Sequence, residues 1–277
     1  MFFTMPTLYL VATPIGNLED ISLRALRILG EVKLIAAEDT RRTRRLLSAY
    51  KIKTSLTSYH EHNKDAKLPY LLERLQQEDI ALVSEAGMPG ISDPGYELVL
   101  AAIEQDIPLV AIPGPSVLPT AIAVSGLPTN QFLYLGFLPR GKGERKRLLD
   151  SIASEPRTIV AFESPHRLLD SLNDLLEVLG DRRISVCREL TKVYEEVFRG
   201  TVSQAIAHFS QPRGEFTLVI AGCSRGRSQE ELTDYFIKEE LRRLRREGVT
   251  AKEATAKLTA VTHLPRKVLY KAWLELD

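Results

Sequence analysis

The 277-residue chain contains only two cysteines, Cys187 and Cys223, far apart in apolar, strand-like surroundings. This spacing excludes a disulfide framework, and neither cysteine has the neighbouring ligands that a zinc site requires. We therefore expect a cytoplasmic protein, kept in a reducing compartment, that binds no metal. The first ten residues, MFFTMPTLYL, lack both a basic segment and a small-residue cleavage site, so no signal peptide is expected.

A membrane span and a strong overall charge are also missing. No charged residue occurs between Ile107 and Pro139, but prolines interrupt every part of this apolar stretch. A transmembrane helix needs about 20 continuous apolar residues, so this segment is predicted to be a buried core with a proline-rich loop. The net charge is only +1. Any nucleic-acid partner must therefore be held by local basic patches.

Two common nucleotide-binding motifs are absent as well. None of the glycine-rich loops continues into the Gly-Lys-Ser/Thr of a Walker A motif, and none has GxGxxG spacing at the start of a helix. Nucleoside triphosphates and NAD are therefore poor candidates. The loops leave open a ligand with an adenine and a small polar tail, held by backbone groups.

The most informative stretch is ALVSEAGMPGISDPG, residues 81–95. It begins within an apolar strand, Ile80–Val83, and then turns sharply through several glycines and prolines. Ser92 or Asp93, just before a proline, is expected to cap a helix that runs to about Glu104. In open α/β sheets, ligand sites lie where a strand is connected to the next helix by such a loop. A tight connection without a ligand is the alternative.

Alternation of strands and helices in the first half of the chain predicts a mostly parallel sheet. The predicted strands of this half are residues 7–12, 33–37, 55–58, 80–83 and 108–112, with helices at 18–29, from 40, and at 64–76. The second half predicts a mixed sheet, because strand 196–200 follows strand 184–189 after a short connection.

The predicted fold class is α/β, with two α/β domains and a small C-terminal helical domain. The other strands expected in the second half are residues 132–137, 157–162 and 216–221, with helices at 143–154, 166–179 and 202–209. A linker at 224–228 and three helices near 229–247, 250–261 and 265–276 are expected to follow. The predicted domains are 1–126, 127–224 and 225–277.

Polar residues follow two of the predicted first-half strands. Glu38, Asp39 and Arg41 form either a helix cap with an internal ion pair or an arginine held to contact a phosphate or a hydroxyl. His60 and His62 belong either to a surface loop or to a substrate contact. Metal binding is not predicted there, because no further ligand has the required spacing.

Basic residues gather in four clusters, at 41–45, 140–147, 242–246 and 266–271. A charged helix face is usually just solvated, but the second cluster, RGKGERKR, contains two glycines and few acids. A mobile basic loop of this kind suits a phosphate backbone. The C-terminal helices have proportions similar to a helix-turn-helix.

Eight motifs occur in a fixed order along the chain: LVATPIGN (10–17), AEDTR (37–41), HEHN (60–63), GISDPG (90–95), PGPS (113–116), GFLP (136–139), ESPHR (163–167) and RELTK (188–192). On these motifs the chain resembles, over essentially its whole length, the bacterial 16S rRNA (cytidine-2′-O)-methyltransferases of the tetrapyrrole methylase superfamily. The resemblance implies two α/β domains with S-adenosylmethionine in the cleft between them, and a homodimer. It also implies methyl transfer to the ribose 2′-hydroxyl of a cytidine in the decoding region of 16S rRNA, in the small ribosomal subunit.

The resemblance also implies site residues. The cofactor cleft is expected to be lined by Pro14, Gly16, Glu85, Ala86, Gly87, Met88, Ser116, Val117, Phe162 and Thr217. The family usually has Ser-Asp-Ala-Gly-Thr-Pro where this chain has SEAGMP, at 84–89, so individual contacts are expected to differ there. The RNA is expected to contact Arg42, Arg140, Lys142, Arg145, Lys146 and Arg147.

The methyl group of a sulfonium needs no metal activation, so the enzyme's task is chiefly to position the reactants. A ribose hydroxyl is a weak nucleophile, and a base within hydrogen-bond reach would help it. We expect Asp39 or His62 to be that base, and Arg41 to hold a phosphate or the hydroxyl.

Two other functions stay open on the sequence. A precorrin or uroporphyrinogen C-methyltransferase would share the superfamily, but it predicts a closed site without the basic loop at 140–147 or the C-terminal helices. A non-catalytic ribosome-assembly factor would keep the fold for RNA binding alone. Such a factor would not bind the cofactor, and the changes at Glu85 and Met88 are compatible with it.

Overall fold

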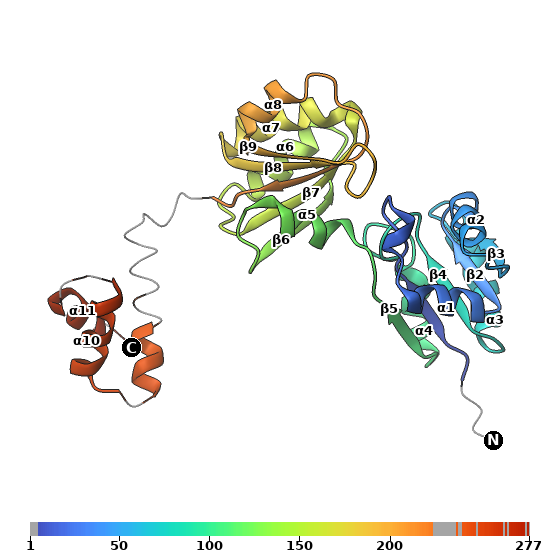
Figure 1. Ribbon diagram of the computed structural model, residues 1–277, viewed down its shortest axis with the longest axis horizontal. Helices are drawn as coiled ribbons and strands as arrows, with labels where there is room; N and C mark the ends of the chain where they lie inside the picture. The colour runs from blue at the N-terminus through green and yellow to red at the C-terminus, as the bar shows by residue number, and fades with distance from the viewer. Residues whose placement is uncertain are drawn as a thin grey trace. The chain divides into compact units, whose positions relative to one another are not determined.

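The structure is a computed structural model that describes residues 5–223, 237, 240–247, 249–262, 264, 266–274 and 276. The chain divides into two compact units, one of residues 1–153 and 157–221 and the other of residues 154–156 and 222–277. The larger unit contains two β-sheets, and the smaller one contains the C-terminal helices (Figure 1). The predicted linker at 224–228 and most of the predicted helix at 229–247 lie outside the described residues.

The first sheet has five strands in the order β3-β2-β4-β1-β5, and every pairing is parallel. Its strands are β1 (Leu8–Val11), β2 (Leu34–Ala37), β3 (Ser55–Ser58), β4 (Ile80–Val83) and β5 (Leu109–Ile112). The predicted parallel sheet is thus confirmed. β2 and β4 are buried at every position, as expected for central strands with both faces covered.

Four α-helices follow the strands of the first sheet: α1 (Leu23–Glu31), α2 (Thr40–Ala49), α3 (Lys64–Leu75) and α4 (Tyr96–Glu104). The expected single helix at 18–29 is wrong. A 3-10 turn, η1 (Leu18–Asp20), comes first, and α1 begins at Leu23 because the Ser22 hydroxyl accepts the backbone N–H of Ala25 at 3.1 Å. Ser22 is therefore the N-cap that separates the two.

Helix α4 begins later than expected. Its N-cap is Gly95, with φ of 149°, and neither Ser92 nor Asp93 caps it. Helix α5 (Val117–Ser125) was not predicted. Its proline, Pro119, lies in the first turn, where proline is tolerated. α5 follows β5 but packs against the second sheet, through Ala121 and Ile122.

The second sheet has the order β6-β7-β10-β8-β9. Its strands are β6 (Phe132–Phe137), β7 (Thr158–Glu163), β8 (Arg183–Arg188), β9 (Glu196–Thr201) and β10 (Phe216–Ile220). Only β6 and β7 pair in parallel, so the predicted mixed sheet is confirmed. Three helices cover one face of this sheet: α6 (Lys142–Ser151), α7 (Leu168–Leu179) and α8 (Val202–His208). A 3-10 turn, η2 (Pro165–Arg167), precedes α7. Helix α5 covers the other face (Figure 1).

In the smaller unit, α10 (Ala251–Thr262) and α11 (Arg266–Leu274) pack around Leu241, Leu258 and Leu269. These helices agree with the predicted ones to within two residues at each end. No helix in the described part of the chain combines the length and the apolar composition needed to cross a membrane.

A buried ion pair joins α6 to α7. The Arg145 guanidinium lies 2.6 Å from Asp174 Oδ2 through one terminal nitrogen and donates through Nε to the same oxygen at 2.8 Å. Both residues are only 3% exposed. Arg145 also donates to the carbonyl of Pro139, so it anchors the segment that leads into α6.

We predict that Arg145→Ala will destabilise the protein by about 3–5 kcal/mol, because it leaves the Asp174 carboxylate buried without its partner. Arg147→Ala removes the same charge from an exposed position on the same helix and should change stability by less than about 0.5 kcal/mol. Urea unfolding of the full chain measures both. Equal effects of the two substitutions would show that the buried pair does not support the packing of α6 on α7.

Candidate active site

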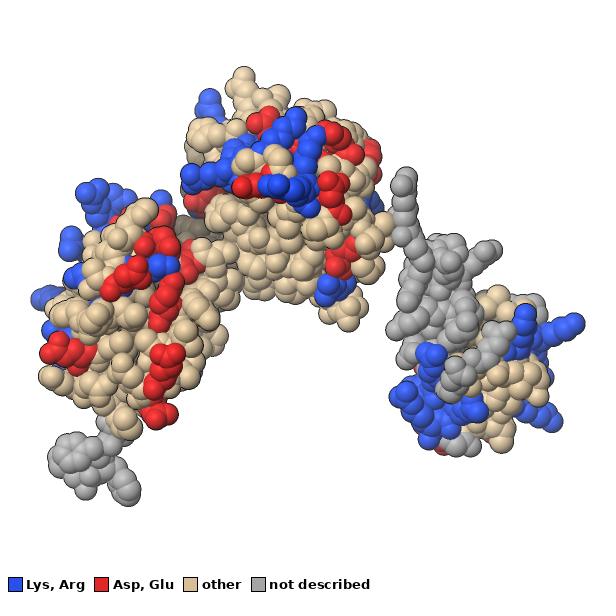
Figure 2. All heavy atoms as spheres, turned by 180° about the vertical axis from the view of Figure 1, so that it is seen from behind, with Lys and Arg blue, Asp and Glu red and all other residues tan. Residues whose placement is uncertain are grey.

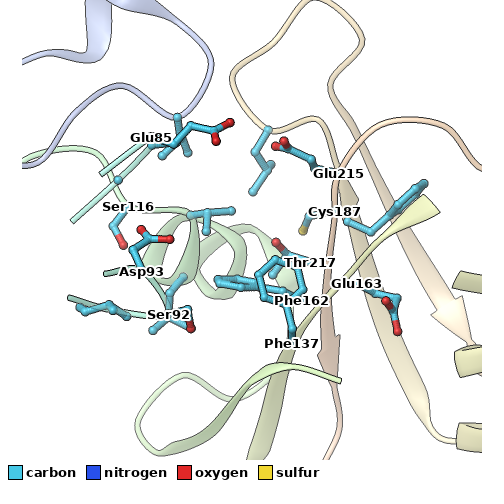
Figure 3. Close-up of a pocket in the computed structure, with 18 of the residues that line it drawn as sticks. Glu85, Ser92, Asp93, Ser116, Phe137, Phe162, Glu163, Cys187, Glu215 and Thr217 are labelled. Carbon is cyan, nitrogen blue, oxygen red and sulfur yellow. The ribbon is translucent and has the colours of Figure 1, made fainter. Parts of the chain in front are cut away.

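A cavity of about 460 Å³ lies between the two sheets of the larger unit (Figure 3). On one side it is lined by loops that leave the carboxyl ends of β1, β2, β4 and β5. On the other side are residues of β6, β7, β8 and β10. Its volume falls in the range of small-molecule sites, and its place at the carboxyl edge of a parallel sheet is the usual one for ligands.

Backbone hydrogen bonds hold two of these loops together. Thr13, after β1, and Gly87, after β4, each donate their N–H to the other's carbonyl at 2.9 Å. Gly87 has a φ of +84°, a conformation that favours glycine. The glycine of the predicted loop therefore serves to turn the chain where it meets the loop after β1.

Apolar and aromatic groups form the opposite wall. The ring of Phe162 packs edge-to-face against Tyr134 and Phe137, with centroids 5.2 and 5.4 Å away. Phe137, Phe162 and Thr217 all line the cavity. A flat apolar ligand face can pack here beside the hydroxyl of Thr217.

The charged residues lining this cavity are all acidic: Glu38, Glu85, Asp93, Glu163, Glu189 and Glu215. Asp93 points toward the centre of the cavity, whereas Glu163 points away from it (Figure 3). Glu163 instead accepts the backbone N–H of Ser164 at 2.7 Å and pairs with Arg167 at 2.6 Å. The ESPHR motif thus builds an ion pair outside the cavity.

Asp93 is the most strongly perturbed acid of the cavity. Burial raises its pKa to about 7, the Glu38 carboxylate adds to the rise, and a hydrogen bond with Ser84 opposes it. The preceding residue, Ser92, has a φ of +63°, and its hydroxyl lies 2.6 Å from the hydroxyl of Tyr134 on β6. The loop that carries Asp93 is therefore tied directly to the second sheet.

Besides Glu163, three further acids of the lining have basic partners. Lys192 Nζ lies 2.9 Å from both Glu189 and Glu215, and Arg42 pairs with Glu85. Burial raises the pKa of Glu85, while Arg42 opposes that rise. The backbone N–H of Glu85 donates to Glu38 at 2.9 Å, which fixes the start of the loop.

A family model described as Tetrapyrrole (Corrin/Porphyrin) Methylases matches residues 7–206. A ribosomal RNA small subunit methyltransferase I from Synechocystis sp. is 48% identical over 277 residues, 99% of either chain. The chain belongs to the tetrapyrrole methylase family, in its ribosomal RNA small subunit methyltransferase I branch. It is therefore a methyltransferase, and S-adenosylmethionine is the methyl donor that the family implies.

Two further relatives with the same name agree. The one from Thermotoga maritima is 52% identical over 221 residues, 79% of this chain and 99% of its own. The one from Bacillus subtilis is 44% identical over 275 residues, 97% of this chain and 94% of its own.

Solved structures of the family share the fold with this methylase. A diphthine synthase matches with a TM-score of 0.61 at 14% identity, over 78% of this chain and 90% of its own. A uroporphyrin-III-C-methyltransferase from Thermus thermophilus matches with a TM-score of 0.54 at 21% identity, over 77% of this chain and 93% of its own. At these identities the similarity concerns the fold alone.

Most of the predicted cofactor residues lie together in the methylase cavity. Eight of the ten line it: Glu85, Ala86, Gly87, Met88, Ser116, Val117, Phe162 and Thr217. The other two, Pro14 and Gly16, line a second, smaller cavity next to it. Cofactor contacts of these ten residues stay a prediction.

The three predicted catalytic residues line neither cavity. Asp39 caps α2, accepting the backbone N–H groups of Arg41 at 2.7 Å and Arg42 at 3.2 Å. The hydrogen bonds from Arg42 and Arg41 hold the pKa of Asp39 below its usual value, which makes it a weak base. Arg41 and His62 are exposed.

The predicted RNA-binding residues differ in exposure. Arg42, Arg140, Lys142 and Arg147 are exposed, and Lys146 is half-buried in an ion pair with Glu177. Arg145 is the exception: its buried pairing with Asp174 leaves no guanidinium surface for RNA, so its role is structural.

Asp93 is the main site residue that the sequence prediction missed. A serine and an aspartate before a proline are typical of a helix cap, so the sequence predicts that role for Ser92 or Asp93. The GISDPG motif contains the residue, but only the fold shows that its carboxyl points into the cavity.

Proposed function

We propose that this chain transfers a methyl group from S-adenosylmethionine to the ribose 2′-hydroxyl of a cytidine in the decoding region of 16S rRNA. The observation that carries the proposal is the cavity between the sheets, whose charged lining is acidic and whose second wall is aromatic. The named relatives, 44–52% identical, supply the class of acceptor.

The residues present fit this cofactor. S-adenosylmethionine carries a sulfonium and an ammonium group, which acidic side chains favour, and an adenine, which an apolar wall favours. Glu38 and Asp93 lie on the first side and Phe162 on the other. When bound, the cofactor supplies an electrophilic methyl group on a positively charged sulfur.

We assign the role of base to Asp93. Its carboxyl points into the cavity, and a pKa of about 7 lets it accept the hydroxyl proton near neutral pH. Asp39 is less suited, because two backbone N–H groups already stabilise its charge. The Ser92–Tyr134 hydrogen bond holds the Asp93 loop against β6.

The two alternative functions are less well supported. The uroporphyrin-III-C-methyltransferase described above is only 21% identical to this chain, so it carries no argument about the substrate. A non-catalytic assembly factor would have no need for a cavity with these linings. The exposed basic residues of α11, Arg266, Lys267 and Lys271, fit an RNA partner, and Figure 2 shows many lysines and arginines on the described part of this unit.

We also propose that the chain is a cytoplasmic homodimer. Tyr96, Leu100 and Ile103 on α4 are 68, 41 and 56% exposed. Spaced by four and three residues, they form one apolar face of the helix, beside the sheet edge at β5. A second copy is the occupant that the family resemblance implies, and a two-fold interface would bring the same face of each copy together.

Methyl transfer is tested with small subunits from cells that lack this modification. We expect calorimetry to show one S-adenosylmethionine per chain, and labelled methyl groups to appear on a cytidine 2′-oxygen. Phe162→Ala should weaken cofactor binding by about 10-fold, the value of one lost aromatic contact. Saturable cofactor binding without transfer to any form of 16S rRNA would contradict the proposed acceptor.

Asp93→Asn should lower kcat by about 10²–10⁴, the usual contribution of a general base. Only the ionised carboxylate accepts a proton, so kcat of the wild type should rise with pH up to about 7 and then level off, while Asp93→Asn loses this dependence. Cofactor affinity should also fall, because the substitution removes one of the acids that favour the cationic cofactor, so kcat is measured at saturating cofactor. Asp39→Asn and His62→Ala are the comparison variants, and a larger loss in either would remove Asp93 from the role.

Leu100→Asp should convert the dimer to a monomer in analytical ultracentrifugation, because it places a charge in the apolar face of α4. Leu23→Asp is the matched control, since Leu23 is 86% exposed on α1. A wild-type protein that sediments as a monomer at all concentrations would contradict the dimer.

A further inference from the structure

We propose that the second, smaller cavity binds a phosphodiester group of the RNA strand, next to the ribose that is methylated. This inference rests on the proposed function and adds to it a binding site for the acceptor. The cavity has a volume of about 360 Å³ and shares Ile15, Glu85 and Ala86 with the cofactor cavity. The two cavities therefore meet at a common wall.

The charges of the two cavities are opposite. The cofactor cavity is lined by acids, whereas the second cavity is lined by Arg42, Arg45 and Lys192, with Glu85 as its one acid among the described residues. Arg42 pairs with Glu85, and Lys192 pairs with Glu189 and Glu215 of the neighbouring cavity. Among the described residues of this lining, Arg45 is therefore the cation without an ion pair. A cationic methyl donor suits the first cavity, and an anionic phosphodiester suits the second.

Side chains, and not a helix end, must bind the anion here. The backbone N–H groups of Arg41 and Arg42, in the first turn of α2, already donate to the Asp39 carboxylate. The N-terminus of α2 is therefore closed to a phosphate. Arg45 lies one turn further along the helix, is exposed, and contributes to the cavity lining.

The wall that carries Lys192 is held rigidly against the first sheet's loops. A Cβ on Gly16 would lie 2.5 Å from Lys192 Cγ and 2.7 Å from Thr191 Oγ1, so only glycine permits this approach. The backbone N–H of Asn17 donates to Thr191 Oγ1 at 3.1 Å. Glu189 and Thr191 both have positive φ, 50° and 68°, a strained conformation that clusters at functional sites.

Lys192 keeps a donor for a ligand. Its ammonium has three N–H groups, of which Glu189 and Glu215 use two. Its side chain is 27% exposed. The two carboxylates thus position the ammonium at the wall between the cavities, with one N–H directed elsewhere.

The chemistry of a nucleotide explains why a phosphate site should lie next to the site of methyl transfer. In RNA the 2′-hydroxyl and the 3′-phosphate are attached to neighbouring ribose carbons. A hydroxyl that enters the first cavity beside the methyl donor and Asp93 therefore has its own phosphate close by, and the second cavity, which shares Ile15 and Ala86 with the first, is the neighbouring site. The second cavity would fix the register of the strand, while the first binds the reactive group.

The test compares Arg45→Ala with Arg44→Ala. Both arginines are exposed on α2, but only Arg45 lines the cavity. The measured quantity is the equilibrium Kd for unmethylated small subunits, determined from 50 to 300 mM KCl without added cofactor. For a single-stranded site, loss of one phosphate contact should reduce the slope of log Kd against log salt by about 0.7.

We expect this reduced slope in Arg45→Ala and the wild-type slope in Arg44→Ala. Arg45→Lys, which keeps the positive charge, should recover most of the wild-type slope. Calorimetry should give the same cofactor affinity in all three variants. Equal slopes for Arg45→Ala and Arg44→Ala would overturn the phosphate site, and so would a changed cofactor affinity in Arg45→Ala alone. Because binding is read without turnover, a wild-type protein that binds subunits but does not methylate them would count against the proposed function only.

Discussion

The two hydrogen bonds exchanged by Thr13 and Gly87 are the contact on which both cavities depend. They join the loops after β1 and β4 at 2.9 Å each. Gly87 lines the cofactor cavity and Thr13 lines the smaller one, so the bridge lies between the two. Because parallel strands end at the same edge of a sheet, these loops were bound to be neighbours. The bridge turns that proximity into a fixed wall.

The cavities divide charge in a way that suits a reaction between a cation and an anionic polymer. Asp93 and Glu38 line the cavity in which we propose that the positive methyl donor binds, and Arg45 lines the cavity on the other side of the shared wall. With the proposed ligands, each cavity would attract its own ligand more strongly than the other one. The arrangement favours one orientation of the strand before any base is recognised.

Much of this architecture could be predicted from the sequence, because it depends on local signals. Short apolar runs such as Ile80–Val83 identified the strands, and the short connection between β8 and β9 identified the antiparallel pair. The glycine-rich loop after β4 identified one wall of the cavity between the sheets. Three features depend on tertiary contacts and could not be predicted in this way. Helix α5 is a predominantly apolar segment without a periodic pattern. Asp93 turns into a cavity instead of capping α4, and Arg145 is neutralised by Asp174 from another helix.

Helix α5 also determines how the cleft can move. It follows β5 of the first sheet but packs on β8, β9 and β10 of the second, so within residues 5–223 the chain passes between the two sheets through Pro113–Ser116. Ser116 at the end of this crossing itself lines the cavity between the sheets. Two prolines restrict the backbone rotation of the crossing. Any opening of the cleft must therefore change the backbone of residues 113–116. Because this segment also lines the cavity, a bound ligand would restrict that change directly.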